Sequence, residues 1–372
     1  MKKILFMPLF QMPSGHHKAA DALMANIQQV YPSVDCKKID FLSYWNEPIE
    51  RMISSFYLKW IRLFPRHYES FYRQHMYHSH PLSKNRQKDR HWLFDQKLMR
   101  LLEEEKPDLV VCTHCFPSKL LSALKRRNVI KIPVINVYTD FFINDVWGIK
   151  DVDFHFVPDK EAKEYLMSRW GIGEKQIFVT GIPVHPGFYR SQTARKQDKP
   201  VILVAGGNGG LGNVTHYLKQ VSFHSSYQFN VLCGNNQRLY EELLSWKNPC
   251  IKPLPYISDR NQMNELYNQA DAIVTKAGGI TLSEALIKRL PIFIHTALPG
   301  QEQINVEYLT KKQLIIPLQF DVPFEEQLKS LLQNDMERNR MNKRIERYVE
   351  EREHILEELI RFNPSSSLAL EP

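Results

Sequence analysis

The stretch AIVTKAGGITLSEA, residues 272–285, decides the fold of this chain. It opens with an apolar run typical of a buried strand, turns at a pair of glycines and continues as a helix. Because glycine has no Cβ, the backbone N–H groups at the start of that helix can approach a bulky anion. The stretch therefore predicts an α/β unit whose strand-to-helix turn binds a diphosphate.

Residues of this turn receive separate roles. Lys276, Gly278, Gly279 and Thr281 lie where the donor would bind. Glu284, one helical turn further on, is placed to reach sugar hydroxyls. Thr281 and Glu284 also have the spacing of a capping box, in which the two side chains only close the helix start. The spacing leaves both roles open, and they do not exclude each other.

Short apolar runs alternate with helical stretches along the chain. Several runs are apolar throughout, which is typical of parallel strands covered on both faces. The predicted strands are 3–8, 109–112, 134–138, 154–157, 177–180, 201–205, 229–233, 272–275 and 291–294. The predicted helices include 18–30, 118–128, 160–171, 263–270 and a long pattern at 324–362 with a break near Asn334. The sequence thus predicts an α/β fold of parallel sheets.

A polar, charged segment after Pro186 divides the chain into two doubly wound, Rossmann-like domains. We place the first at 1–187 and the second at 188–350, facing each other across a cleft. A C-terminal helix and tail, 351–372, are expected to pack back on the first domain. Ligands of doubly wound domains bind at the carboxyl ends of the strands, where the glycine clusters fall.

Composition limits the partners and the compartment. The net charge of +8 favours anionic partners, but no nucleic-acid-binding signature accompanies it, so we expect no nucleic acid. The five cysteines are scattered, which indicates a reducing, cytoplasmic compartment and no disulfide framework. The sequence holds no apolar run of about 18 residues, the length of a membrane-spanning helix.

A second glycine cluster, 206–212, follows the strand predicted at 201–205. It matches the dinucleotide pattern GxGxxG, but such a site also needs an acid after the next strand, and 231–236 has none. NAD is therefore rejected. We expect Gly207, Asn208 and Gly209 to form a second loop close to phosphate, the alternative being an ordinary tight turn.

The segment after the first strand places Gly15, His16 and His17 at the start of a helix. An imidazole at that position can accept a proton from an acceptor hydroxyl, because its pKa lies near working pH. The alternatives are a polar group at a helix start or simple anion binding. Asp140 ends another strand and either orients His16 or the acceptor, or caps the next turn.

Two further groups of polar residues have weaker patterns. Gln301, Glu302 and Asn305 follow the strand at 291–294 and either contact donor-sugar hydroxyls or merely begin a helix. Asp151 and Asp153 imitate a D-x-D metal motif, but they precede a strand instead of ending one. We expect no metal and no cofactor.

An aromatic and basic segment, 44–77, predicts a pair of amphipathic helices. Its aromatic residues, which include Trp45 and Trp60, are interleaved with basic residues, which include Arg62 and Arg66, and this suits the headgroup zone of an anionic membrane. Ordinary core packing with a solvated basic face is the alternative. The membrane interpretation places the protein peripherally on the inner face of the cell membrane.

With these motifs in order, the chain resembles the glycosyltransferases that include monogalactosyldiacylglycerol synthases and processive diacylglycerol glucosyltransferases. More distantly it resembles the UDP-GlcNAc transferase of lipid II synthesis. The likeness covers about residues 1–350. It is carried by the segments 15–20, 139–141, 180–183, 276–285 and 299–302.

The resemblance implies a GT-B fold and an inverting, metal-independent transfer of a hexose from a UDP-sugar to a lipid acceptor. The first domain then binds the acceptor and the second the donor. His16 matches the general base and Glu284 the ribose-binding acid. Tyr256 and Ile257 lie where uracil is held. The family's Gly-Gly-Gly-His is Pro13-Ser14-Gly15-His16 in this chain, which changes the acceptor-side loop.

Two alternatives remain on the same fold. A UDP-sugar 2-epimerase would need acids on both sides of the sugar ring, and the sequence shows no such pair. A non-catalytic UDP-sugar sensor is suggested only by the altered loop before His16.

Overall fold

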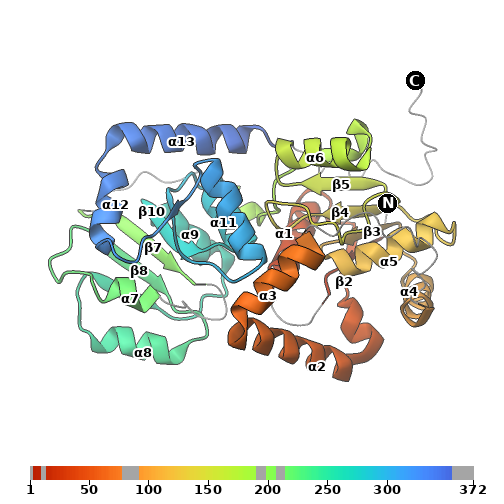
Figure 1. Ribbon diagram of the computed structural model, residues 1–372, viewed down its shortest axis with the longest axis horizontal. Coiled ribbons are helices and arrows are strands. Elements are labelled where there is room, and N and C mark those ends of the chain that lie inside the picture. Colours follow the sequence, from red (N-terminus) through yellow and green to blue (C-terminus); the bar gives the residue numbers. More distant parts are fainter. Residues whose placement is uncertain (1–2, 10–13, 78–91, 190–197, 207–213, 354–372) are drawn as a thin grey trace. The chain divides into compact units, whose positions relative to one another are not determined.

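The computed structural model describes residues 3–9, 14–77, 92–189, 198–206 and 214–353. It divides into two compact units (Figure 1). The first runs to His185 and takes back the chain from Glu351, and the second is Pro186–Glu350.

The first unit is built on a six-stranded parallel sheet. Its strand order is β2-β1-β3-β4-β5-β6. The strands are β1 (Lys3–Met7), β2 (Asp35–Lys38), β3 (Leu109–Cys112), β4 (Val134–Val137), β5 (Phe154–Val157) and β6 (Ile177–Val179). The helices are α1 (Gly15–Val30), α2 (Phe41–Leu63), α3 (Pro65–Tyr72), α4 (Trp92–Glu105), α5 (Cys115–Arg126) and α6 (Lys160–Trp170), with shorter turns at Arg73–Tyr77 and Glu174–Gln176.

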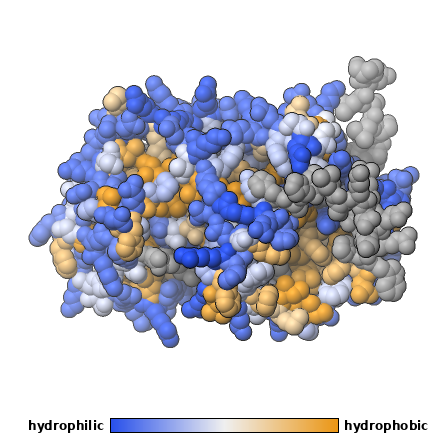
Figure 2. All heavy atoms as spheres, viewed as in Figure 1, coloured by the Kyte–Doolittle hydropathy of each residue, from blue (hydrophilic) through white to orange (hydrophobic). Residues whose placement is uncertain are grey.

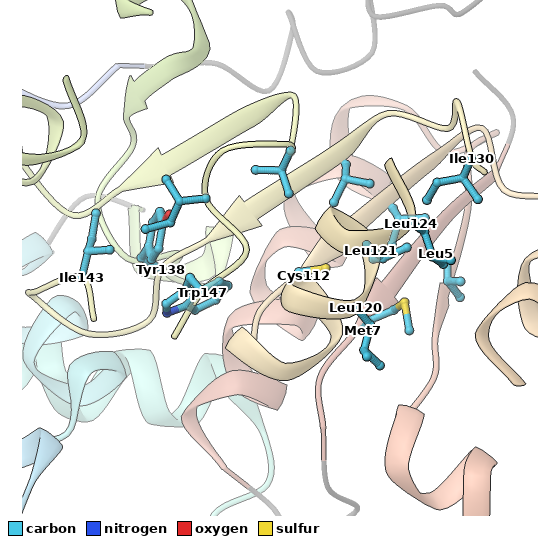
Figure 3. Close-up of a cluster of buried hydrophobic side chains, with 14 of the residues drawn as sticks. Leu5, Met7, Cys112, Leu120, Leu121, Leu124, Ile130, Tyr138, Ile143 and Trp147 are labelled. Carbon is cyan, nitrogen blue, oxygen red and sulfur yellow. The ribbon is translucent and has the colours of Figure 1, made fainter. Parts of the chain in front are cut away.

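Residues of this sheet alternate between two cores, as side chains of a strand must. Leu5 and Met7 of β1 point toward α5, where Leu120 and Leu121 cover them (Figure 3). Ile4 and Phe6 point to the other face, where Ala20, Leu23 and Ile27 of α1 pack. Because both faces are covered, the central strands are apolar throughout.

The second unit repeats this plan with the strand order β12-β11-β10-β7-β8-β9, again parallel. Its strands are β7 (Val201–Ala205), β8 (Gln228–Leu232), β9 (Ile251–Leu254), β10 (Ala272–Lys276), β11 (Ile292–Thr296) and β12 (Ile316–Pro317). Its helices are α7 (Val214–Leu218), α8 (Gln237–Ser245), α9 (Arg260–Gln269), α10 (Gly279–Ile287), α11 (Gln301–Lys311), α12 (Phe324–Leu332) and α13 (Asp335–Glu350), with a short turn at Pro186–Tyr189.

Each sheet has one point at which the direction of winding reverses. In the first unit it lies between β1 and β3, and in the second between β7 and β10. Loops after such neighbouring strands diverge and leave room for a ligand. The turns that follow β1, β3, β7 and β10 are therefore the places to look for a site.

The predicted strands are all present, and the helical break near Asn334 is confirmed by the gap between α12 and α13. Three strands were missed: β2, β9 and β12. All three are sheet edges. Edge strands need no apolar cover on both faces, so polar residues and proline are tolerated there and the apolar signal is weak.

The chain from Glu351 completes the first unit at the end of β6. The backbone N–H of Glu353 donates to the carbonyl of Val179 at 2.7 Å, and the Val179 N–H donates back to the Glu353 carboxylate at 3.1 Å. Arg352 donates to the Ile182 carbonyl at 3.3 Å. Its guanidinium occupies the space where Gly181 would carry a Cβ.

The aromatic and basic segment does form two helices, α2 and α3. Asn46 has extended backbone inside α2, and its side chain accepts from the Ile49 N–H at 3.1 Å, so a second helix start follows the kink. Pro48 then falls in a first turn, where its missing N–H is harmless. Hydrophobic surface lies over this region (Figure 2). Among the described residues, no helix is long and apolar enough to cross a membrane.

Candidate functional site

The turn between β10 and α10 has the expected form. Gly278 is the N-cap of α10, with φ −75° and ψ 130°, and no side chain caps the helix start. Thr281 lies inside the first turn of the helix, so the capping box considered for Thr281 and Glu284 is wrong. The first N–H groups of α10 therefore lack a side-chain cap, which suits an anion.

Gly278 has no conformational reason to be glycine. Its φ is open to any residue, and among the described residues an added Cβ would meet one atom within 4 Å, Glu302 Oε1 at 3.8 Å. The described part of the chain therefore leaves the space beside it nearly empty. A glycine there leaves the front of the helix start open to a ligand.

Lys276, at the end of β10, lies beside the same turn. Its Nζ is 3.7 Å from Glu302 Oε1, and both side chains are largely buried. The other carboxylate oxygen of Glu302 accepts from the Leu298 N–H at 2.7 Å. The structure thus brings Lys276, Gly278 and Glu302 together, as the sequence analysis expected.

Helix α11 supplies the other residues near this turn. Gln301 is its first residue and is half-buried, directly after Gly300, whose φ of +83° favours glycine. Asn305 is fully buried, and its amide donates to the Ala277 carbonyl at 3.2 Å. In this position Asn305 fixes the β10–α10 turn, and its contact to the donor sugar stays a prediction.

Glu284 lies on the second turn of α10 and is 8% exposed. Its Oε2 accepts from the hydroxyl of Tyr267 on α9 at 3.0 Å. Burial, followed by the charge of Glu284 and this hydrogen bond, raises the pKa of Tyr267 well above its usual value. Tyr267 therefore remains a donor at neutral pH and fixes the carboxylate.

The remaining donor-side residues are more scattered. Tyr256 is exposed and Ile257 half-buried, in the segment after β9. Gly279 is the buried first residue of α10. Gly207, Asn208 and Gly209 lie outside the described residues, but β7, which precedes them, pairs with β10.

In the first unit, His16 lies in the first turn of α1, behind exposed Gly15. Its Nδ1 is 2.9 Å from the hydroxyl oxygen of Thr139, which follows β4. Its ring also meets His114 edge-on, with centroids 4.7 Å apart. His114 follows β3, so this contact falls at the point where the winding of the first sheet reverses.

Both imidazoles are held neutral. Burial lowers the pKa of His16 to about 4, partly opposed by the backbone of Thr113, so the predicted pKa near working pH is wrong and His16 is a weaker base than a free imidazole. Burial and then the neighbouring His16 lower the pKa of His114 well below its usual value. His114 Nδ1 accepts from the Phe116 N–H at 3.0 Å and so caps α5. A neutral imidazole carries the lone pair that a general base needs.

His17 and Asp140 have other neighbours. His17 Nε2 is 3.1 Å from Asp40, the residue before α2, and both belong to the scaffold around α1. Asp140 acts on two buried tyrosines of α3, since burial and then, among other charges, Asp140 raise the pKa values of Tyr68 and Tyr72. Thr139, next to Asp140, supplies the hydrogen bond to His16.

The residues predicted to contact a membrane surface fall into two groups, two packed tryptophans and two exposed arginines. Trp45 packs on Phe94 with ring centroids 4.6 Å apart, and Trp60 packs on Tyr68 at 5.4 Å, so both rings contribute to internal packing. Arg62 and Arg66 are exposed. The exposed apolar set lies nearby: Met52, Ile53, Phe56, Leu58, Leu63, Phe64 and Phe71.

The D-x-D segment is structural. Asp151 accepts from Ser122 and Arg126, and Asp153 accepts from Lys125 and the Val134 N–H. These contacts tie α5 to the start of β5. Among the described residues, no group of three His, Cys, Asp or Glu is arranged to hold a metal ion.

Sequence reasoning missed Thr139, His114 and Tyr267. Each comes from a segment distant in sequence from the residue that it contacts. The available signal was positional: Thr139 and His114 both follow predicted strands, and His114 follows the strand that pairs with β1.

Two doubly wound units, one with a glycine turn at a helix start and the other with a neutral histidine at its reversal point, define a glycosyltransferase of the GT-B fold. A family model of monogalactosyldiacylglycerol (MGDG) synthase matches residues 16–184. The chain is 38% identical over 355 residues to an uncharacterized glycosyltransferase, YkoN, of Bacillus subtilis, covering 94% of each chain. It belongs to this family of glycosyltransferases.

Two further comparisons agree with this assignment. A processive diacylglycerol beta-glucosyltransferase of Bacillus cereus is 32% identical over 282 residues, covering 72% of this chain and 71% of that one. The crystal structure of Acinetobacter baumannii MurG superposes with a TM-score of 0.58 at 16% identity, covering 98% of this chain and 100% of MurG. The expected family and GT-B fold are confirmed.

Proposed function

We propose that this glycosyltransferase transfers a hexose from a UDP-sugar to a hydroxyl of diacylglycerol or a related membrane lipid. The transfer proceeds with inversion and without a metal. The lipid acceptor is supported by the names of the matched family and of the Bacillus cereus relative, a diacylglycerol beta-glucosyltransferase.

The proposed donor site rests on the N-terminus of α10, which no described side chain caps. Gly278 leaves the space beside it nearly free of described atoms, the first N–H groups of the helix lack a side-chain cap, and Lys276 lies beside them. In the proposed complex the diphosphate accepts from these N–H groups and pairs with Lys276, releasing Glu302 toward the sugar hydroxyls. Glu284, fixed by Tyr267, accepts from the ribose.

In the proposed reaction the acceptor oxygen attacks the anomeric carbon while the bond from that carbon to the diphosphate oxygen breaks. His16 takes the acceptor proton, which its neutral imidazole can accept. The electron pair of the broken bond goes to the leaving UDP. The helix dipole of α10 and Lys276 stabilise that charge, and this would make a metal unnecessary.

The exposed apolar set on α2 and α3 supports delivery of a lipid acceptor. Phe56 is 66% exposed and Phe64 is 55% exposed, and Lys59, Arg62 and Arg66 lie among the same residues. Apolar side chains with basic neighbours suit peripheral binding to anionic lipid.

The test is a panel of radiolabelled UDP-sugars incubated with the protein and a total lipid extract, with EDTA in one arm. A labelled glycolipid that forms equally with EDTA is the expected product, and NMR of its anomeric proton reports inversion. Epimerised UDP-sugar without acceptor would identify an epimerase instead. UDP binding without any transfer would identify a sensor.

A further inference from the structure

His295 lies beside the β10–α10 turn and has no role in the function proposed above. Ile294 pairs with Thr275, but the next pair is Thr296 with Lys276, so the register shifts and His295 is the extra residue of a β-bulge. Bulges re-aim side chains and occur preferentially next to active sites. This one lies at the carboxyl end of β11, beside the last residue of β10.

The imidazole of His295 is buried without the hydrogen bonds that burial demands. It is 7% exposed, and within the described part of the chain neither ring nitrogen has a hydrogen-bond partner. A buried polar group left in this state destabilises a protein. Such a group calls for an explanation, and a bound ligand is one.

The surroundings of His295 identify the chemistry of that ligand. Burial and then the charge of Lys276 lower the pKa of His295 to about 4, partly opposed by the Ala205 backbone, which lies near the ring but outside hydrogen-bond geometry. Ala205 pairs with Thr275 across β10, so the imidazole lies among the strand ends β7, β10 and β11. At neutral pH it therefore carries one N–H donor beside an ammonium and the start of α10.

We propose that His295 is a further phosphate-binding residue, donating a hydrogen bond to a phosphate oxygen of the nucleoside diphosphate held by Lys276 and the N-terminus of α10. This assignment rests on the proposed donor site. The bulge places the ring and Lys276 supplies the charge. The phosphate supplies an acceptor for the buried N–H, which has none among the described residues.

The test compares His295→Phe, which fills the same space without a donor, with His295→Gln and His295→Asn, which return an N–H at different reach. Calorimetric titration uses UDP, ADP, GDP, inorganic pyrophosphate and uridine. We expect His295→Phe to weaken diphosphate binding roughly tenfold and leave uridine binding unchanged, since the bond is charge-assisted. One of the amide variants recovers the affinity. His155→Phe, which removes a buried imidazole from the first unit, is the matched control and leaves the affinity unchanged.

Wild-type affinity for diphosphates in the His295→Phe protein, or an equal loss for uridine, overturns the assignment. If His295→Phe fails to fold, ¹⁵N spectra of the wild-type imidazole during pyrophosphate titration decide: the resonance assigned through His295→Gln moves, or the inference is wrong. If the protein binds ADP or GDP more tightly than UDP, and His295→Phe still weakens diphosphate binding, the UDP donor is refuted and the role of His295 stands. Sugar transfer from UDP with no His295 effect refutes this inference alone.

Discussion

His114 meets His16 edge-on, with the two ring planes at 80° and the centroids 4.7 Å apart. The contact joins the segment after β3 to the first turn of α1. His114 also caps α5 through the Phe116 N–H. Its backbone and side chain are therefore both fixed, and it acts as a rigid support for the proposed base.

The first prediction concerns this support. His114→Ala should lower kcat roughly tenfold, because an unsupported His16 spends less time in the productive orientation. KM for the donor should not change. His114→Phe keeps the ring edge and should restore most of kcat, although loss of the cap destabilises the fold by about 1 kcal/mol. Steady-state kinetics of the two variants provide the measurement, and equal kcat values in both would argue against the support role.

The second prediction concerns stability at low pH. Burial lowers the pKa of His155 to about 3, against 6.5 for the free group. As pH falls below 6.5 the unfolded state binds this proton first, so stability is complete above 6.5 and decreases toward the folded pKa by about 1.4 kcal/mol per pH unit. Urea unfolding at pH 6 and pH 4.5 should show a smaller decrease for His155→Gln. His224→Gln, at an exposed position, should behave like the wild type.

The third prediction concerns the open helix start. Gly278→Ser adds a favoured N-cap residue, so the free energy of unfolding should change by no more than about 0.5 kcal/mol. The added side chain would occupy the space proposed for the diphosphate, and the Kd for UDP should rise at least about tenfold, or about 1.4 kcal/mol. Calorimetry gives the affinity, and urea unfolding checks the fold. Unchanged UDP affinity would remove the observation on which the donor site rests.

The fourth prediction uses two glycines with nearly the same backbone. Gly171 and Gly181 have φ of +67° and +71°, but a Cβ on Gly171 meets no described atom within 4 Å, whereas one on Gly181 overlaps Arg352. Gly171→Ala should therefore show only the conformational cost, about 1–2 kcal/mol. Gly181→Ala should be more destabilising, by about 1 kcal/mol or more. Urea unfolding measures both, and adding Arg352→Ala to Gly181→Ala should remove the excess. Equal losses at the two glycines would show that Arg352 moves aside freely.

The fifth prediction concerns lipid surfaces. Phe56→Ser combined with Phe64→Ser should lower partitioning to vesicles that contain anionic lipid by at least about tenfold, because each ring would bury apolar area worth about 1.5–3 kcal/mol. Vesicle sedimentation measures it. Phe223→Ser, which removes a ring 56% exposed in the second unit, is the control and should have no effect. Binding that survives the double substitution would place the lipid contact elsewhere.

Sequence patterns predicted the central strands because those strands are buried on both faces and must be apolar. They missed β2, β9 and β12, whose edge positions relax that requirement. The capping box at Thr281 also failed, because the helix begins three residues earlier, at the Gly278 cap. Local spacing describes what residues can do in a helix, but it does not fix the residue at which the helix begins.

The site residues also divide into those that the sequence pattern predicts and those that it does not. Lys276, Gly278 and Glu302 were predictable because each directly follows or opens a recognisable element. His114, Thr139 and Tyr267 were not, since their relevance depends on strand order and helix packing. Strand order can be inferred only when the edge strands are known, and of the four edge strands the sequence predicted only β6.

The return of the chain to Val179 has a consequence for biosynthesis. Translation proceeds from the N-terminus, so the ribosome has made the whole second unit before Arg352 and Glu353 exist. The end of β6 therefore lacks its hydrogen bonds to Glu353 while more than 150 residues are synthesised. A nascent chain stalled within that interval would carry an open sheet edge, a state in which chaperones or proteases can distinguish it from the finished enzyme.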